Sequence, residues 1–278
     1  EIVGINDIAT PEMCAYLFSY DSVFGPWPGQ AELQGEALVV DGVAIPMHRA
    51  ADLSALDLSG VDLVMECTGR ADSAEVASRG LRGGAGRVLI SGPSAAAELT
   101  VVLGANEGEL AAQRIVSNAS CTTNALAPLL RLVDAEWGIV TGSMTTIHCY
   151  TGSQPTVDAP AADFARSRAA ALSMVPTTTS AGRLVDTVLP HLAGRVIAQA
   201  VRVPTASVSA VDLAVLTTRP VTPEAVNAVL RAAGGVIGAT DLPLVSSDLR
   251  ARPESVVMAC PETRVTEGGL LRVFGWYD

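Results

Sequence analysis

The feature that most constrains the fold of this chain is a change of pattern across residues 115–133. An apolar pair, Ile115 and Val116, is followed by the polar stretch SNASCTTN at residues 117–124. Apolar residues then recur at the i, i+3, i+4, i+7 spacing of one helix face, at Leu126, Leu129, Leu130 and Val133. The pattern predicts a strand that passes into a helix through a polar turn.

Cys121 lies at the start of that predicted helix. Ser120 is a residue type that caps helix N-termini, and the first N–H groups and the helix dipole stabilise an anion there. We therefore expect the Cys121 thiol to be nucleophilic near neutral pH, among hydroxyls that suit a phosphate or an oxyanion. Cysteines in Ala/Val-rich chains are usually small core residues, but polar neighbours at such a junction indicate a reactive site. Pro128 is compatible with the helix if it falls in the first turn.

Composition narrows the class of protein. The 278 residues suit two domains, and 49% hydrophobic content indicates a folded globular protein. A net charge of −11 and a pI near 4.7 argue against broad binding to nucleic acid or an anionic membrane. The five cysteines form no disulfide or zinc pattern, which favours a reducing cytoplasm and no metal site. No signal peptide and no apolar run of about 18 residues is present.

The first 120 residues alternate short apolar runs with helical segments, which predicts a parallel sheet covered on both faces. Ile2, Val3 and Ile5 are expected to form a strand that ends at Asp7. In dinucleotide-binding folds an acidic residue at that place bonds the ribose hydroxyls. Three further candidates follow predicted strands, at the sheet edge where ligands bind in such folds: Thr68, Gly69 and Ser91. An Asp-Gly pair at residues 41–42 predicts a hairpin across residues 38–45.

The remainder predicts an α+β domain. A β-rich run from residue 139 to 150 contains His148, and its separation of 27 positions from Cys121 (148 − 121 = 27) leaves room for a helix and a returning strand. Residues 151–183 are polar and punctuated by Gly and Pro, so we expect a long functional loop. A strand with Val211, Leu213 and Val215 on one face, and a helix from Thr222 to Gly234, are predicted further on.

The SNASCTTN stretch resembles the active-site motif of the phosphorylating glyceraldehyde-3-phosphate dehydrogenases, and residues 20–25, 147–152, 243–248 and 269–278 resemble further family segments in the same order. The resemblance implies that Cys121 is the acylated nucleophile and His148 its base, and that NAD binds at Asp7, Thr68, Gly69 and Ser91. It also implies substrate and phosphate contacts at Ser120, Thr122, Thr151, Ser153, Arg166, Thr179, Ser180 and Arg202. Ser153 and Ser180 depart from the usual Asp and Gly, and Arg168 is a second candidate for the role of Arg166.

The implied activity is the NAD-dependent oxidative phosphorylation of glyceraldehyde 3-phosphate to 1,3-bisphosphoglycerate in glycolysis or gluconeogenesis, by a cytoplasmic homotetramer. The implied fold is a doubly wound, Rossmann-type NAD-binding domain at residues 1–120, and an α+β catalytic domain with a mixed or antiparallel sheet at residues 121–278. The usual Gly-rich turn does not precede Asp7, so we expect the first domain to be N-terminally incomplete and both ends of the chain to be cut. Three alternatives stay open: an erythrose-4-phosphate dehydrogenase, a Cys/His thiol hydrolase, and a non-catalytic binding relative.

Overall fold

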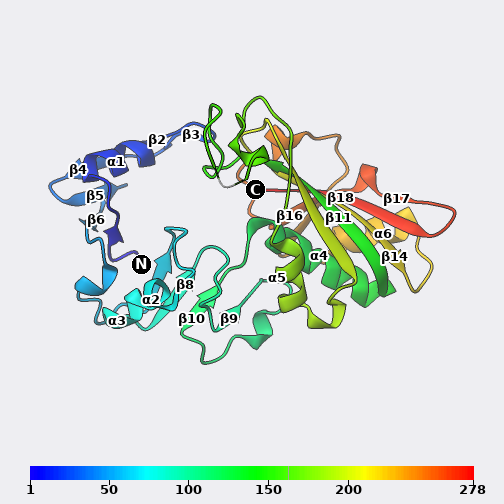
Figure 1. Ribbon diagram of the computed structural model, residues 1–278, viewed down its shortest axis with the longest axis horizontal. Coiled ribbons are helices and arrows are strands. Elements are labelled where there is room, and N and C mark those ends of the chain that lie inside the picture. Colours follow the sequence, from blue (N-terminus) through cyan, green and yellow to red (C-terminus); the bar gives the residue numbers. More distant parts are fainter. Residues whose placement is uncertain (162) are drawn as a thin grey trace. The chain divides into compact units, whose positions relative to one another are not determined.

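The computed structural model describes residues 1–161 and 163–278 in two compact units (Figure 1). The first unit consists of Glu1–Glu98 and Ala112–Ser117, and the second of Leu99–Ala111 and Asn118–Asp278. The predicted boundary at residue 120 differs from this division, because Val102 and Ala105 pack into the core of the second unit. Residue 162 of the predicted loop lies outside the described residues.

The first unit contains the predicted parallel sheet. Strands β7 (Leu63–Glu66), β8 (Arg87–Ile90) and β10 (Ile115–Ser117) run parallel in that order. Two short helices, α2 (Ala74–Ala77) and α3 (Arg79–Arg82), connect β7 to β8. Their apolar side chains pack on the strands around Val88 and Ile90, which are 1% and 2% exposed. The carboxyl ends of β7 and β8 therefore lie side by side at one edge of the sheet.

A second group of strands in the first unit forms a mixed sheet in the order β1-β6-β5-β4. Its strands are β1 (Ile5–Asn6), β4 (Ala31–Gln34), β5 (Ala37–Val40) and β6 (Val43–His48). Between β1 and β4 the chain forms helix α1 (Pro11–Ser19) and a separate ribbon of the two strands β2 (Tyr20–Asp21) and β3 (Gly25–Pro26). The predicted hairpin is confirmed: Asp41 and Gly42 have φ of 48° and 83°, the left-handed values that a tight turn requires. The predicted strand at Ile2 and Val3 is wrong, because β1 pairs with β6 only from Ile5 onward.

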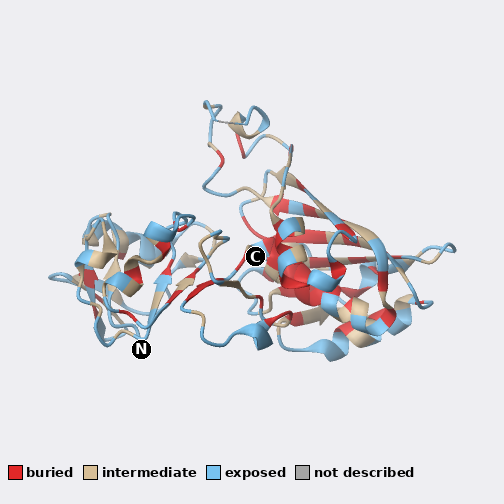
Figure 2. Cartoon of the chain, turned by 60° about the horizontal axis from the view of Figure 1, so that its bottom comes forward, coloured by how far each residue is buried: buried red, intermediate tan, exposed pale blue. Residues whose placement is uncertain are grey.

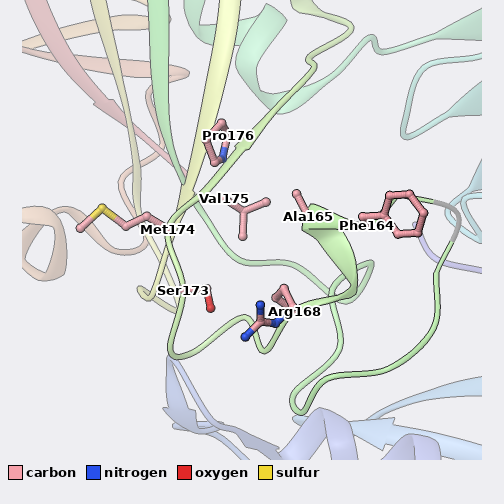
Figure 3. Close-up of a pocket in the computed structure, with 7 residues that line it drawn as sticks. All are labelled: Phe164, Ala165, Arg168, Ser173, Met174, Val175 and Pro176. Atoms are coloured by element: carbon pink, nitrogen blue, oxygen red, sulfur yellow. The ribbon is translucent and has the colours of Figure 1, made fainter.

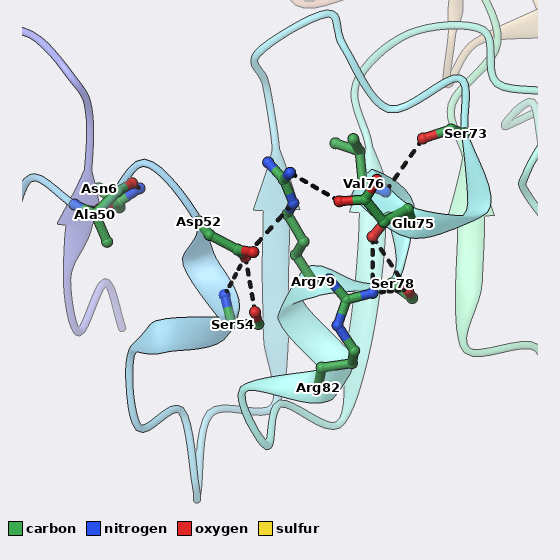
Figure 4. A network of polar contacts seen from close by, with 10 residues as sticks. All are labelled: Asn6, Ala50, Asp52, Ser54, Ser73, Glu75, Val76, Ser78, Arg79 and Arg82. Atoms are coloured by element: carbon green, nitrogen blue, oxygen red, sulfur yellow. Dashed lines mark hydrogen bonds and ion pairs between the residues drawn. The ribbon is translucent and has the colours of Figure 1, made fainter.

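A polar network links α3 to the segment after β6 (Figure 4). The guanidinium of Arg79 lies 3.5 Å from Asp52 and 3.1 Å from Glu75. Asp52 in turn caps the short helix η1 (Leu53–Ala55) by accepting a hydrogen bond from the Ser54 N–H. The two sheets of the first unit are thus connected through charged groups near its surface.

The second unit is built on a mixed sheet of eight strands in the order β12-β13-β11-β14-β18-β16-β15, with β17 paired to β18. The eight strands are β11 (Ile139–Cys149), β12 (Val175–Thr177), β13 (Val196–Val203), β14 (Ser209–Thr217), β15 (Ile237–Thr240), β16 (Val256–Ala259), β17 (Arg264–Val265) and β18 (Leu270–Tyr277). Strand β9 (Leu99–Thr100), at the start of the second unit, is not part of this sheet. The mixed sheet confirms the fold predicted for the second half of the chain. The helices are α4 (Cys121–Trp137), α5 (Ala181–Val188) and α6 (Pro223–Ala233).

One core lies between these helices and the sheet, and Figure 2 shows buried residues concentrated there. Val211, Leu213 and Val215 alternate along β14 and are all fully buried, as predicted. The helix predicted after Thr222 is also confirmed, with Thr222 as its cap and Gly234 as its end. Pro128 lies in the interior of α4, beyond the first turn, and the helix is continuous despite the missing N–H.

Within the predicted loop, the described residues form the short helix η3 (Ala165–Ser167), strand β12 and, from Ala181 onward, the start of α5. The remaining short helices are η2 (Glu107–Glu109), η4 (Pro190–Leu192), η5 (Ser246–Leu249) and η6 (Cys260–Glu262). Across the part of the chain that the structure describes, no helix combines the length and apolarity needed to span a bilayer.

Candidate active site

Cys121 is the first residue of α4, as the sequence predicts. Ser120 caps the helix: it has extended backbone angles (φ −114°, ψ 160°), and its hydroxyl accepts a hydrogen bond from the Thr123 N–H at 3.2 Å. Ala119 precedes it with φ of 57°, a left-handed conformation that turns the chain sharply into the helix. Cys121 is exposed, so its sulfur is open to a ligand at the positive end of a 17-residue helix.

His148 lies next to this thiol. It is the penultimate residue of β11 and is 6% exposed, and its Nε2 atom is 3.6 Å from the Cys121 Sγ. The helix and the returning strand between the two residues bring them into contact, as the spacing allowed. This distance permits proton exchange between sulfur and imidazole once small adjustments shorten it.

The other ring nitrogen of His148 is crowded. Nδ1 lies 2.7 Å from the Cys149 carbonyl oxygen, 2.7 Å from a guanidinium nitrogen (Nη1) of Arg202, and 3.4 Å from the Ser209 hydroxyl. Burial lowers the pKa of His148 below its ordinary value, and the positive charge of Arg202 lowers it further. The imidazole is consequently neutral at neutral pH, the form in which it can accept a proton.

Tyr277 is a part of this site that sequence reasoning missed. Its buried hydroxyl lies 2.7 Å from the hydroxyls of both Thr122 and Thr146, and its ring meets His148 edge-on with centroids 6.0 Å apart. Burial raises the pKa of Tyr277 well above its ordinary value, so this residue acts as a neutral hydrogen-bonding group. It joins β18 to the first turn of α4 and to β11. An aromatic residue near the end of an apolar strand gave no local signal of this role.

The candidate phosphate-binding residues all lie in the second unit, but the side chains of several of them form hydrogen bonds within the protein. The Nε of Arg166 donates to the Thr177 hydroxyl at 2.6 Å, and its charge also lowers the pKa of the partly buried Arg202, after the larger effect of burial. Arg166 and Arg202 are thus electrostatic neighbours, as a site for a polyanion requires.

Four hydroxyls complete this set. The hydroxyls of Thr151 and Ser153 lie 2.9 Å apart on an exposed turn. Thr179 accepts a hydrogen bond from the Ala181 N–H at 3.1 Å, and Ser180 is the residue that precedes α5. The second Arg candidate, Arg168, forms an exposed ion pair with Asp158 at 2.8 Å.

A cavity of about 410 Å³ lies in the same loop (Figure 3). It is lined by Phe164, Ala165, Arg168, Ser173, Met174, Val175 and Pro176. Neither the candidate nucleophile nor the candidate base lines it. Three apolar residues of this loop are almost fully exposed to solvent: Phe164 at 95%, Leu172 at 84% and Met174 at 76%. Exposed apolar residues that lie close together in this way are typical of an interaction surface.

The candidate cofactor residues lie in the first unit. Thr68 and Gly69 follow β7 and Ser91 follows β8, so three of the four meet at the carboxyl edge of the parallel sheet. Gly69 has φ of 69° and no atom within 4 Å of the place of a Cβ, which leaves room for a ligand to approach its backbone. Asp7 follows β1 of the other sheet; it is exposed, and one oxygen of its carboxylate accepts the Ala9 N–H at 2.8 Å. This set of backbone groups, hydroxyl and carboxylate fits a dinucleotide.

Comparisons with known proteins show which family this chain is similar to. The family described as "Glyceraldehyde 3-phosphate dehydrogenase, C-terminal domain" matches residues 120–278, and "Glyceraldehyde 3-phosphate dehydrogenase, NAD binding domain" matches residues 1–74. Glyceraldehyde-3-phosphate dehydrogenases of Xanthobacter flavus and Cereibacter sphaeroides are each 44% identical to this chain, covering 100% of it and 85% of their own length. The enzyme of Geobacillus stearothermophilus is 40% identical, over 100% of this chain and 86% of its own.

Proposed function

The chain belongs to the glyceraldehyde-3-phosphate dehydrogenase family, and we propose that it oxidises glyceraldehyde 3-phosphate with NAD⁺ and inorganic phosphate to 1,3-bisphosphoglycerate. It is an NAD-dependent dehydrogenase, as its family and its relatives are. The observation that carries the assignment of residues is the 3.6 Å contact between the Cys121 sulfur and the His148 imidazole at a capped helix start. The reaction places the activity in glycolysis or gluconeogenesis.

The first step is nucleophilic attack. His148 Nε2 takes the proton of the Cys121 thiol as the sulfur bonds to the aldehyde carbon, and the carbonyl oxygen then takes that proton back from His148. The product is a neutral thiohemiacetal on Cys121. The lowered pKa of His148 keeps the imidazole unprotonated before substrate binds, because burial and then Arg202 disfavour its charged form.

NAD would supply the hydride acceptor when bound. His148 takes the hydroxyl proton of the thiohemiacetal as its carbon loses the hydride, which leaves a thioester on Cys121. Asp7, Thr68, Gly69 and Ser91 would hold this cofactor. The backbone of Gly69 is open to a ligand. The Asp7 carboxylate would accept hydrogen bonds from the ribose hydroxyls, and its charge would repel a 2′-phosphate. NAD is for this reason favoured over its phosphorylated form.

Phosphate groups are held at two places in this proposal. The substrate's own phosphate is bound by Thr151, Ser153 and Arg202, and the attacking inorganic phosphate by Ser120, Thr122, Arg166, Thr179 and Ser180. The Thr122 hydroxyl is bonded to Tyr277, so Thr122 contributes its backbone N–H at the helix start. Attack of phosphate on the thioester carbon releases the acyl phosphate and returns Cys121 as a thiolate.

The exposed apolar loop residues support a homotetramer. A subunit interface would remove the side chains of Phe164, Leu172 and Met174 from water, which is favourable for exposed apolar groups. The molar mass in solution, measured by sedimentation, tests this, and a monomer would contradict it. We also place the protein in the cytoplasm, because its five cysteines are all free thiols.

The decisive experiment follows NADH absorbance with glyceraldehyde 3-phosphate, NAD⁺ and phosphate. We expect phosphate-dependent turnover that falls by about 10³-fold or more in Cys121→Ser, because the hydroxyl is a far weaker nucleophile at neutral pH. Cys14→Ser is the matched control; this half-buried thiol of α1 lies outside the proposed site, so its loss leaves the rate unchanged. Full activity of Cys121→Ser would refute the mechanism, and faster turnover of erythrose 4-phosphate would move the assignment to that substrate.

A further inference from the structure

A buried carboxylate that the proposed mechanism does not use lies at the carboxyl end of β7. Glu66 is the last residue of that strand and is 8% exposed. Its backbone carbonyl accepts a hydrogen bond from the N–H of Ser91 at 3.0 Å, across the edge of the parallel sheet. Glu66 therefore lies where the turns that follow β7 and β8 meet, among the candidate cofactor residues.

One carboxylate oxygen of Glu66 holds the turn that follows β7. Its Oε1 atom accepts hydrogen bonds from the backbone N–H of Thr68, at 3.1 Å, and from the Thr68 hydroxyl. The same hydroxyl accepts the N–H of Arg70 at 3.2 Å. Gly69, between them, has φ of 69° and open space at the place of a Cβ. The carboxylate thus orders the backbone that is proposed to meet the dinucleotide.

The other carboxylate oxygen of Glu66 has no partner. Its Oε2 atom is buried and forms no hydrogen bond with any residue that the structure describes. Nor does a cationic side chain of the described residues form an ion pair with Glu66. Burying a carboxylate without a countercharge is unfavourable, and an uncharged glutamine could accept the same two bonds from Thr68. A charge that opposes stability in this way is typical of a group that serves a ligand.

The proposed cofactor contacts place this charge beside the nicotinamide half of the dinucleotide. Asp7 is proposed to bond the ribose that a 2′-phosphate would occupy, which is the adenosine ribose. That assignment leaves the nicotinamide half for Thr68, Gly69 and Ser91, at the edge of the parallel sheet. The nicotinamide ring is positively charged in NAD⁺ and neutral in NADH, so a nearby carboxylate attracts the ring only in the oxidised form.

We propose that Glu66 is a positioning and specificity-determining residue of the cofactor site: Oε1 orders the Thr68–Gly69 turn, and the unpaired charge makes the protein bind NAD⁺ more tightly than NADH. This inference rests on the proposed function, which assigns the cofactor to these residues. The reaction consumes NAD⁺ and releases NADH, so the preference favours replacement of the reduced cofactor by the oxidised one.

The test compares the unmodified protein with Glu66→Gln by isothermal titration calorimetry with NAD⁺ and with NADH, at neutral pH and without substrate. Glutamine has the shape of glutamate and keeps an acceptor for Thr68, so the variant removes only the charge. We expect the ratio of the NADH dissociation constant to the NAD⁺ dissociation constant to fall by about tenfold, through weaker binding of NAD⁺. Urea unfolding should show no loss of stability, because the charge removed was buried and unpaired.

Two further variants separate the charge from the turn. Glu66→Ala removes the acceptor of both Thr68 bonds as well as the charge, so it should bind NAD⁺ and NADH about tenfold more weakly than Glu66→Gln does. Glu75→Gln is the matched control, because it makes the same chemical change in α2 of the same unit. The side chain of Glu75 is 69% exposed, so water screens its charge and the ratio of dissociation constants should stay unchanged.

Four results would overturn the inference. An unchanged ratio in Glu66→Gln would show that the carboxylate only holds the turn, and an equal fall in Glu75→Gln would show a general effect of charge. Equal affinities of Glu66→Ala and Glu66→Gln would refute the role of Oε1. A large loss of stability in Glu66→Gln would show that the charge serves the fold.

These titrations need no turnover, so they stand apart from the NADH experiment. A protein that shows the expected preference for NAD⁺ but does not oxidise glyceraldehyde 3-phosphate would contradict the proposed function and support the role of Glu66. Turnover together with an unchanged ratio in Glu66→Gln would do the reverse.

Discussion

At the scale of single residues, the environment of His148 decides when the proposed catalysis can begin. Burial, and after it the charge of Arg202, lowers the pKa of His148 below the ordinary 6.5. A lowered pKa means that the imidazole stays neutral, and stays able to accept a proton, at pH values where a free histidine would already be charged.

The pH profile of kcat/KM follows from this sign. Because kcat/KM reports groups of the free enzyme, its acid limb should lie below pH 6.5, and activity should fall only as pH drops through the lowered pKa. Arg202→Gln removes the second cause of the lowering, so it should move this limb toward higher pH. The measurement is initial NADH formation across pH 5–8 at low substrate. An acid limb above pH 6.5 in the unmodified protein would contradict the neutral imidazole.

At the scale of elements, the helix that carries Cys121 depends on its cap for both stability and geometry. Ser120→Ala removes the acceptor of the Thr123 N–H and should lower the free energy of unfolding by about 1 kcal/mol. Thr222→Ala is a matched control, since Thr222 caps α6 through the same contact with the Ala225 N–H at 3.3 Å. Urea unfolding should give similar losses for both variants, but only Ser120→Ala should slow turnover, because Ser120 also adjoins the nucleophile. Equal turnover rates in the two variants would show that Ser120 caps the helix but has no role in catalysis.

The caps and turns are the elements that the sequence predicted best, since their signals are local. The Ser120 cap, the Asp41–Gly42 turn and the Thr222 start each depend on residues within four positions of one another. Pro128 shows the limit of such rules, because the packing of a buried helix outweighs the loss of one N–H.

Contacts between distant strands could not be predicted in this way. The pairing of His148 with Arg202 depends on β13 lying beside β11, and the bond from Tyr277 to Thr122 joins residues 155 positions apart. The pairing that starts β1 at Ile5 depends equally on β6. Strand order and register settle these contacts, and a single sequence carries no direct signal of either. The sequence therefore predicted the candidate residues of the site, but not the distant neighbours that contact them.

At the scale of the whole molecule, the net charge of −11 opposes the anionic substrates that the site is proposed to bind. Arg166 and Arg202 attract phosphate only at short range, whereas the acidic surface repels it from afar. Salt screens the long-range part first, because the Debye length falls from about 30 Å at 0.01 M to about 8 Å at 0.15 M ionic strength. Added sodium chloride over this range should raise kcat/KM for glyceraldehyde 3-phosphate by about twofold, through faster encounter. Unphosphorylated glyceraldehyde, being neutral, is the control and should show no such rise. A fall in kcat/KM with added salt would show instead that the two arginines govern the approach of the substrate, and that the acidic surface does not.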